Sequence, residues 1–127
     1  MGVAETKAVM EAYTGGGGSL FDVIDESAVY HDVGSGDDRV GHEQIAAMFK
    51  EFYQERLVGE ATLVSSVVGE DAFSCEYRMT GRHVGEFAGK PGTGEEFTAD
   101  FAVFYQVTDG KIMAARVYFP SEQVVGA

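Results

Sequence analysis

A chain of 127 residues, with 45% apolar and 24% charged residues, has the size and composition of a folded domain rather than of a disordered segment. Its 21 acidic and 9 basic residues give a formal net charge of −12, and such a surface repels phosphate backbones and anionic lipid headgroups. We therefore expect no nucleic acid and no membrane among its partners. The longest apolar runs, such as 101–105, are also too short to span a bilayer.

The N-terminus and the single cysteine bear on the cellular compartment. The start MGVAETKAVMEAY has no basic region followed by an apolar core, so we expect no signal peptide. Cys75 is the only cysteine and cannot form an intramolecular disulfide, which agrees with a reducing environment. We expect a cytoplasmic protein in which Cys75 is a small buried hydrophobic residue.

The first half of the chain predicts helices and one strand. Residues 3–13 carry apolar side chains at helical spacing, and the glycines that follow end this helix. The segment GGGGS (15–19) has the composition of a flexible linker, but we interpret it as a natural loop within one domain. Its Ser19 is a suitable N-cap for a short second helix, LFDVIDE. Residues 28–33 then read as a strand, and an amphipathic third helix follows Gly41.

From residue 60 the hydrophobic pattern changes to a period of two. The segments ATLVSSVVG, AFSCEYRMTG, EEFTADFAVFYQV and KIMAARVYF read as strands, and Asp109-Gly110 predicts a tight turn between the last two. Helices followed by antiparallel strands predict an α+β fold. We expect one domain, residues 1–127, in which a curved antiparallel sheet wraps around the N-terminal helices as a cone-shaped α+β barrel. An internal apolar pocket would lie between the two layers.

Alternation along the strands predicts which side chains face this pocket. The odd positions are apolar in 73–79 and in 113–119, so they should point inward. The segment 97–107 is apolar on both faces, which suggests that one face lines a cavity and the other meets helices or a second subunit. We therefore expect a small apolar ligand and a homodimer that forms through the sheet. The expected pocket residues are Tyr30, Phe49, Phe73, Tyr77, Met79, Phe104, Met113, Ala115, Val117 and Phe119.

Three titratable residues are candidates for chemistry. In SAVYHDVGSG, Asp32 ends an apolar run, so its carboxylate either caps the turn or projects into the pocket. Asp100 lies among aromatic residues and is either a functional acid or an outward-facing residue. His83 could transfer a proton or bind a substrate oxygen, or it could be a rim residue bonded to a loop carbonyl. The three histidines lack metal-ligand spacing and the glycines form no nucleotide-binding motif, so we expect neither a metal nor a cofactor.

Three segments carry a resemblance to a known family: AVYHDVGSG with the following VGHEQIAAMF, the run TGRHVGEFAGKPGTGEEF, and the closing DGKIMAARVYF. Together they resemble the SnoaL-like polyketide cyclase and ketosteroid isomerase group of the nuclear-transport-factor-2-like superfamily, over nearly the whole chain. The resemblance implies cofactor-independent proton transfer on a polyketide- or steroid-like carbonyl compound. It places Asp32 at the position of the isomerases' proton-abstracting aspartate, and it matches His83 to a family histidine. Tyr13 corresponds to the tyrosine that donates to the enolate oxygen if GGGGS replaces a longer loop.

The sequence also departs from this family pattern. The second oxyanion donor of the isomerases would fall at Ala102, two residues after Asp100. Val117 and Phe119 stand where the cyclases and the limonene-epoxide hydrolases carry an acid on the last strand. Two hypotheses therefore remain. The first is an isomerase- or cyclase-type enzyme with Asp32 as general base and Tyr13, Asp100 or His83 at the enolate oxygen. The second is a non-catalytic ligand-binding or dimerisation module with the same cavity.

Overall fold

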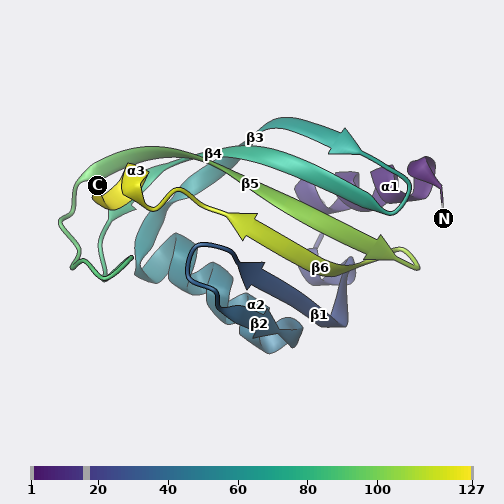
Figure 1. Cartoon of the computed structure of the whole chain (residues 1–127), viewed down its shortest axis with the longest axis horizontal. Coiled ribbons are helices and arrows are strands. Elements are labelled where there is room, and N and C mark those ends of the chain that lie inside the picture. The colour runs from purple at the N-terminus through teal and green to yellow at the C-terminus, as the bar shows by residue number, and fades with distance from the viewer. Residues whose placement is uncertain (1, 16–17, 127) are drawn as a thin grey trace.

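The computed structural model describes residues 2–15 and 18–126, so part of the GGGGS loop (residues 16 and 17) lies outside the described residues. Figure 1 shows a bent sheet with helices on its inner side and at its ends. The elements in chain order are α1 (Val3–Thr14), the 3₁₀ turn η1 (Leu20–Asp22), β1 (Ile24–Asp32), β2 (Asp38–Val40), α2 (Gly41–Lys50), its π-helical continuation η2 (Glu51–Glu55), β3 (Leu57–Val68), β4 (Ala72–His83), β5 (Glu96–Thr108), β6 (Lys111–Tyr118) and α3 (Glu122–Val125). No helix in the described part of the chain is both long and apolar enough to cross a membrane.

The sheet has six strands in the order β2-β1-β6-β5-β4-β3. This arrangement confirms the α+β class and the curved sheet around helices. The sheet is mixed rather than purely antiparallel: β1 runs parallel to β6, and all other neighbouring strands of the sheet are antiparallel. The two strands of the parallel pair are neighbours in the sheet but far apart in sequence, because the chain between β1 and β6 forms the other strands and α2.

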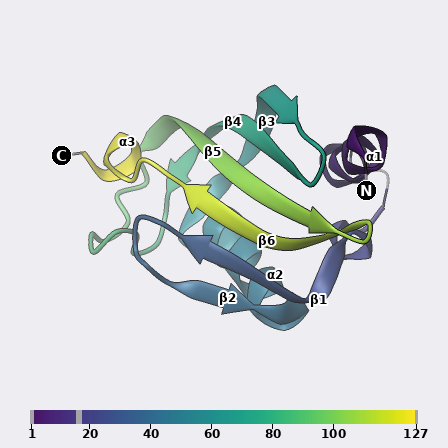
Figure 2. The same ribbon diagram turned by 45° about the vertical axis from the view of Figure 1, so that its right-hand side comes forward.

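The long strands β3, β4 and β5 curve over α2, as Figures 1 and 2 show from two directions. Two glycines face each other on β3 and β4: Gly59 pairs with Gly81. A Cβ on Gly81 would lie 2.2 Å from the carbonyl oxygen of Val58, and one on Gly59 would lie 2.3 Å from that of Thr80. The close approach of the two backbones therefore requires glycine on both strands.

The hydrophobic core lies on the inner face of the sheet. In β4 the odd positions Phe73, Cys75 and Met79 are buried, which confirms the predicted alternation and the burial of the cysteine. Every odd position of β5 from Phe97 to Val107 is buried as well, whereas most even positions are exposed. The apolar even positions of β5 therefore belong to the outer face.

The predicted short helix LFDVIDE is mostly wrong. Ser19 does cap a turn, since the Phe21 N–H donates to Ser19 Oγ at 3.2 Å, but only Leu20–Asp22 are helical. Ile24 already begins β1, where it is buried and pairs with Ile112 of β6. The pairing with β6 thus overrides the local helical pattern. The Asp109-Gly110 hairpin is confirmed, and both of its residues have positive φ.

Candidate functional site

A cavity of about 450 Å³ lies between the inner face of the sheet, the end of α1, and the helical segments α2 and η2. Ten of its lining side chains are aromatic: Tyr13, Tyr30, Phe49, Phe52, Tyr53, Tyr77, Phe87, Phe101, Tyr105 and Phe119. The β1–β2 hairpin contributes the charged lining residues Asp32, Asp37 and Arg39 together with Ser35. The cavity is therefore apolar over most of its wall and has a polar end at this hairpin.

Two hydrogen-bonded tyrosine pairs lie side by side in the wall. The Tyr30 hydroxyl donates to the Tyr13 hydroxyl at 2.9 Å, and the hydroxyls of Tyr77 and Tyr105 are 2.8 Å apart. The rings of Tyr13 and Tyr105 are 5.0 Å apart, which connects the pairs. Burial raises the pKa of all four phenols, so they stay protonated at neutral pH and can donate hydrogen bonds. For Tyr13, the hydrogen bond from Tyr30 acts in the opposite direction and lowers the pKa.

Asp32 combines the two roles that the sequence left open. Its Oδ1 accepts a hydrogen bond from the Gly34 N–H at 3.1 Å, and its Oδ2 accepts one from Ser35 Oγ at 3.0 Å. The carboxylate thus caps the turn after β1. The same residue is half-buried and lines the polar end of the cavity. It is positioned by the turn and reachable from the cavity.

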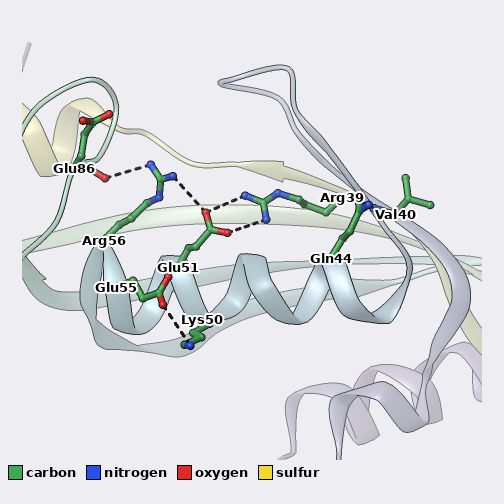
Figure 3. A network of polar contacts seen from close by, with 8 residues as sticks. All are labelled: Arg39, Val40, Gln44, Lys50, Glu51, Glu55, Arg56 and Glu86. Atoms are coloured by element: carbon green, nitrogen blue, oxygen red, sulfur yellow. Dashed lines mark hydrogen bonds and ion pairs between the residues drawn. The ribbon is translucent and has the colours of Figure 1, made fainter.

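Arg39 is the cation of the polar end, and Figure 3 shows the network that holds it. Its two terminal nitrogens donate to the Glu51 carboxylate at 3.0 and 3.1 Å. Arg56 lies 3.4 Å from the same carboxylate and donates to the Glu86 carbonyl at 3.3 Å. The hydrogen bonds between Arg39 and Glu51 raise the pKa of the guanidinium and lower that of the carboxyl, while partial burial opposes both shifts.

The predicted pocket residues divide into those that reach the cavity and those that do not. Tyr30, Phe49, Tyr77, Val117 and Phe119 line it. Phe73, Met79 and Ala115 do not, because the inner face of the sheet is longer than the cavity. Met113 is a correction for a different reason: the register of β6 with β5 shifts between Ala114 and Ile112, so the buried Ile112, opposite Val107, takes the inner position that the alternation predicted for Met113. Phe73, for example, stacks on the ring of Tyr105 at 4.5 Å and packs against α1 through Tyr13.

Asp100 and Phe104 are corrections, because both lie on the outer face of β5. Asp100 is exposed and receives two hydrogen bonds from Arg78, at 2.8 and 3.2 Å, which lower the pKa of its carboxyl group. The Arg116 guanidinium lies over the Phe104 ring, with its Cζ atom 4.6 Å from the centre of that ring. The register of β4 and β5 pairs Arg78 with Asp100 and so turns this carboxylate away from the cavity.

His83 is also placed differently from either expected role. It is buried and does not line the cavity, and its Nε2 has no hydrogen-bond partner among the described residues. The loop after β4 brings Phe87 next to it, with ring centres 6.4 Å apart, and Phe87 is the residue that reaches the cavity. His83 is therefore a residue of the protein interior in this structure.

Several lining residues were missed from the sequence. Phe101, Val103 and Tyr105 share one face of β5, so the period-two pattern could have identified them had the inner face been known. Arg39 has no local signal, because its partner Glu51 is 12 residues away. Within residues 2–15 and 18–126, no group of three His, Cys, Asp or Glu side chains gathers as a metal site would require.

Comparisons with known proteins agree with this fold. The sequence model of the SnoaL-like domain matches residues 7–115. Among curated proteins, none matches the chain. A candidate SnoaL-like polyketide cyclase from Jannaschia sp. CCS1 superposes with a TM-score of 0.77 at 16% identity, covering 98% of this chain and 94% of that one. The candidate polyketide cyclase IdmH from Streptomyces antibioticus superposes with a TM-score of 0.71 at 25% identity, covering 96% of this chain and 94% of that one. A nuclear-transport-factor-2-like protein from Burkholderia xenovorans LB400 superposes with a TM-score of 0.73 at 18% identity, covering 98% of this chain and 96% of that one.

Proposed function

Because this chain belongs to the SnoaL-like domain family, we propose that it is a cofactor-independent isomerase or cyclase acting on a small apolar carbonyl compound of polyketide or steroid type. Membership in this family supports cyclase- or isomerase-type chemistry in general. The observation that carries the finer proposal is an aromatic cavity with Asp32 at its polar end and the hydrogen-bonded Tyr13 in its wall.

In the proposed reaction, Asp32 removes a proton from the carbon next to the substrate carbonyl. The C–H electron pair becomes the new C=C bond, and the π electrons of the carbonyl move onto its oxygen. Tyr13 donates a hydrogen bond to the resulting enolate, in a cavity where the apolar wall strengthens that bond. The enolate then takes the proton back at another carbon, which is isomerisation. Alternatively the enolate carbon attacks a second carbonyl carbon of the same molecule, the oxygen of that carbonyl takes the proton back from Asp32, and the new C–C bond closes a ring.

The turn supports the role of Asp32 by orienting its carboxylate. The Gly34 N–H and Ser35 Oγ each bind one oxygen, so the group is held at the end of β1 rather than free to rotate. Each oxygen of a carboxylate can accept more than one hydrogen bond, so these contacts leave capacity for a proton.

The second candidate function is a non-catalytic binding module. It is favoured by the apolar Val117 and Phe119 in the cavity wall, since the family cyclases carry an acid on this strand. A module of this kind would bind apolar molecules and leave them chemically unchanged. The two functions therefore differ in whether a bound ketone exchanges its α-protons.

We expect Asp32→Asn to abolish α-proton exchange of a simple apolar ketone. The probe is 2-tetralone in D₂O, with loss of the α-proton signals followed by NMR. The exchange catalysed by the wild-type protein should fall by about 100-fold or more, because the general base is gone. Asp25→Asn is the matched control. Asp25 lies near the start of the same strand, its carboxylate likewise accepts hydrogen bonds from a residue two positions on (Ser27 N at 2.9 Å and Ser27 Oγ at 2.7 Å), and it does not line the cavity.

Two results would contradict the proposal. Unchanged exchange in folded Asp32→Asn would reject this residue as the base. Binding of 2-naphthol, which has the shape of the enol of 2-tetralone, without any exchange above buffer would favour the binding module.

A further inference from the structure

We propose that Arg39 and Glu51 are a positioning pair that sets the charge beside Asp32, with Glu51 tuning the basicity of that carboxylate without contacting the substrate. The proposal rests on the function proposed for Asp32. It concerns residues that no local sequence pattern connects, and it starts from the geometry of the polar end of the cavity.

The β1–β2 hairpin places Arg39 diagonally across from Asp32. Arg39 pairs with Tyr30, and Tyr30 and Asp32 are two residues apart on β1, so all three share the inner face. Diagonal neighbours on one face of an antiparallel pair are about 7–8 Å apart, which is within the range of charge–charge interaction. Asp37 lies opposite Asp32, and its carbonyl oxygen accepts the Asp32 N–H at 2.8 Å.

Glu51 reaches this hairpin from η2 and does not itself line the cavity. Figure 3 shows its carboxylate facing the Arg39 guanidinium from η2, with Arg56 on its other side. Both terminal nitrogens of Arg39 are engaged, and this two-pronged contact fixes the direction of the guanidinium. The two side chains are only 29% and 25% exposed, so solvent screens their charges less than it screens a surface pair.

The charged groups around Asp32 can be named element by element. The hairpin contributes Asp37 and Arg39, and η2 contributes Glu51 with Arg56 behind it. Strand β6 presents the apolar Val117, the partner of Asp32 in the parallel pair. His31 and Asp38 pair with each other at 2.7 Å, and His31 follows Tyr30, so this pair belongs to the other face of the hairpin.

Arg39 is therefore the only cationic side chain among the described residues that line the cavity, and Glu51 neutralises it. The charges of Asp37 and Asp32 add to the effect of Glu51 in raising the pKa of Arg39. Removing the charge of Arg39 should make Asp32 more basic. Removing that of Glu51 should leave Arg39 uncompensated and make Asp32 less basic.

The first test measures the pKa of Asp32 directly, without substrate. The side-chain carboxyl carbon is followed by NMR over a pH titration and assigned by its loss in Asp32→Asn. Arg39→Gln should raise the pKa of Asp32 by roughly 0.5–1 unit, and Glu51→Gln should lower it by a similar or smaller amount. The double variant should lie between the two. Glu55→Gln is the matched control, because Glu55 is on the same helical turn and pairs with Lys50 at 3.5 Å on the surface.

The second test follows the pH dependence of 2-tetralone exchange. The acid limb of the pH profile should shift to higher pH in Arg39→Gln and to lower pH in Glu51→Gln. A merely structural pair would lower activity without shifting the limb in opposite directions. If Arg39→Gln does not fold, the isosteric Glu51→Gln decides by itself. Shifts of the same sign, or no shift in a folded Glu51→Gln, would overturn the inference.

These outcomes are separable from those of the proposed function. If Asp32→Asn leaves exchange intact, the base assignment fails, and the carboxyl titration still decides whether the pair controls the charge on Asp32. If Asp32→Asn abolishes exchange but Glu51→Gln moves neither the titration nor the acid limb, only the present inference fails.

Discussion

The hydroxyl of Tyr13 is the group best placed to respond to a developing negative charge in the cavity. It accepts a hydrogen bond from Tyr30, and this bond stabilises the phenol's anionic form. A phenol supported in this way is a stronger hydrogen-bond donor than an isolated buried one. The Tyr77–Tyr105 pair beside it offers further hydroxyls, so the wall can bind an oxygen at more than one point.

We expect Tyr13→Phe to slow 2-tetralone exchange by roughly 100-fold, because one donor to the enolate oxygen is lost. Binding of 2-naphthol, followed by its fluorescence, should weaken in the same variant. Tyr118→Phe serves as the control, since this side chain is 47% exposed and does not line the cavity. Equal exchange rates in wild type and Tyr13→Phe would remove Tyr13 from the mechanism.

Among single residues, the sequence could place Asp32 at a strand end but could not choose between turn cap and cavity residue. The structure shows that the choice was unnecessary, since one carboxylate can accept bonds from the turn and still line the cavity. Asp100 shows the opposite case. Its surroundings in sequence are aromatic, yet the pairing of β4 with β5 brings Arg78 to it on the outer face.

At the scale of elements, the period-two pattern predicted the second half of the chain well. Strands β3 to β6 lie close to where the alternation put them. Burial alternates along β4 and β5, as expected of antiparallel strands with one face in the core, whereas most of β3 is exposed. The pattern failed for β5, where both faces are apolar and only the register with its neighbours identifies the inner one. It also missed β2 and α3, which are three and four residues long and too short to show a period.

The close approach of β3 and β4 at Gly59 and Gly81 gives a prediction at this scale. We expect Gly81→Ala to destabilise the protein by about 1–3 kcal/mol, because the added methyl group collides with the β3 backbone. Urea unfolding measures the free energy. Thr80→Ala, at an exposed position on the same strand, should change it by no more than about 0.5 kcal/mol. Similar values for the two variants would show that the strands can separate without cost.

The whole molecule presents an outer sheet face that combines ion pairs with large apolar groups. Arg78–Asp100 and Arg82–Glu96 lie on it, next to Phe104 and the exposed Tyr118. The homodimer expected from the sequence would form through this face. The net charge of −12 on each copy opposes association, and added salt screens that repulsion.

We therefore expect a dimer whose stability rises with salt. Light scattering coupled to size exclusion, at low and high sodium chloride, measures the mass of the particle. Phe104→Glu should shift it toward the monomer by placing a carboxylate in the interface, while Glu55→Gln on η2 should not. A wild-type monomer at all salt and protein concentrations would reject the dimer.

The parallel pairing of β1 with β6 has a consequence for synthesis on the ribosome. Asp32 lies opposite Val117, and the Val33 N–H donates to the Val117 carbonyl at 3.0 Å. The first strand in the sequence therefore gains this partner only after the last strand has been synthesised. While the chain is still emerging, the β1–β2 hairpin has one free edge and an exposed apolar side. Asp32 is translated early, but the cavity that it lines is complete only after β6, which carries Val117, has joined the sheet.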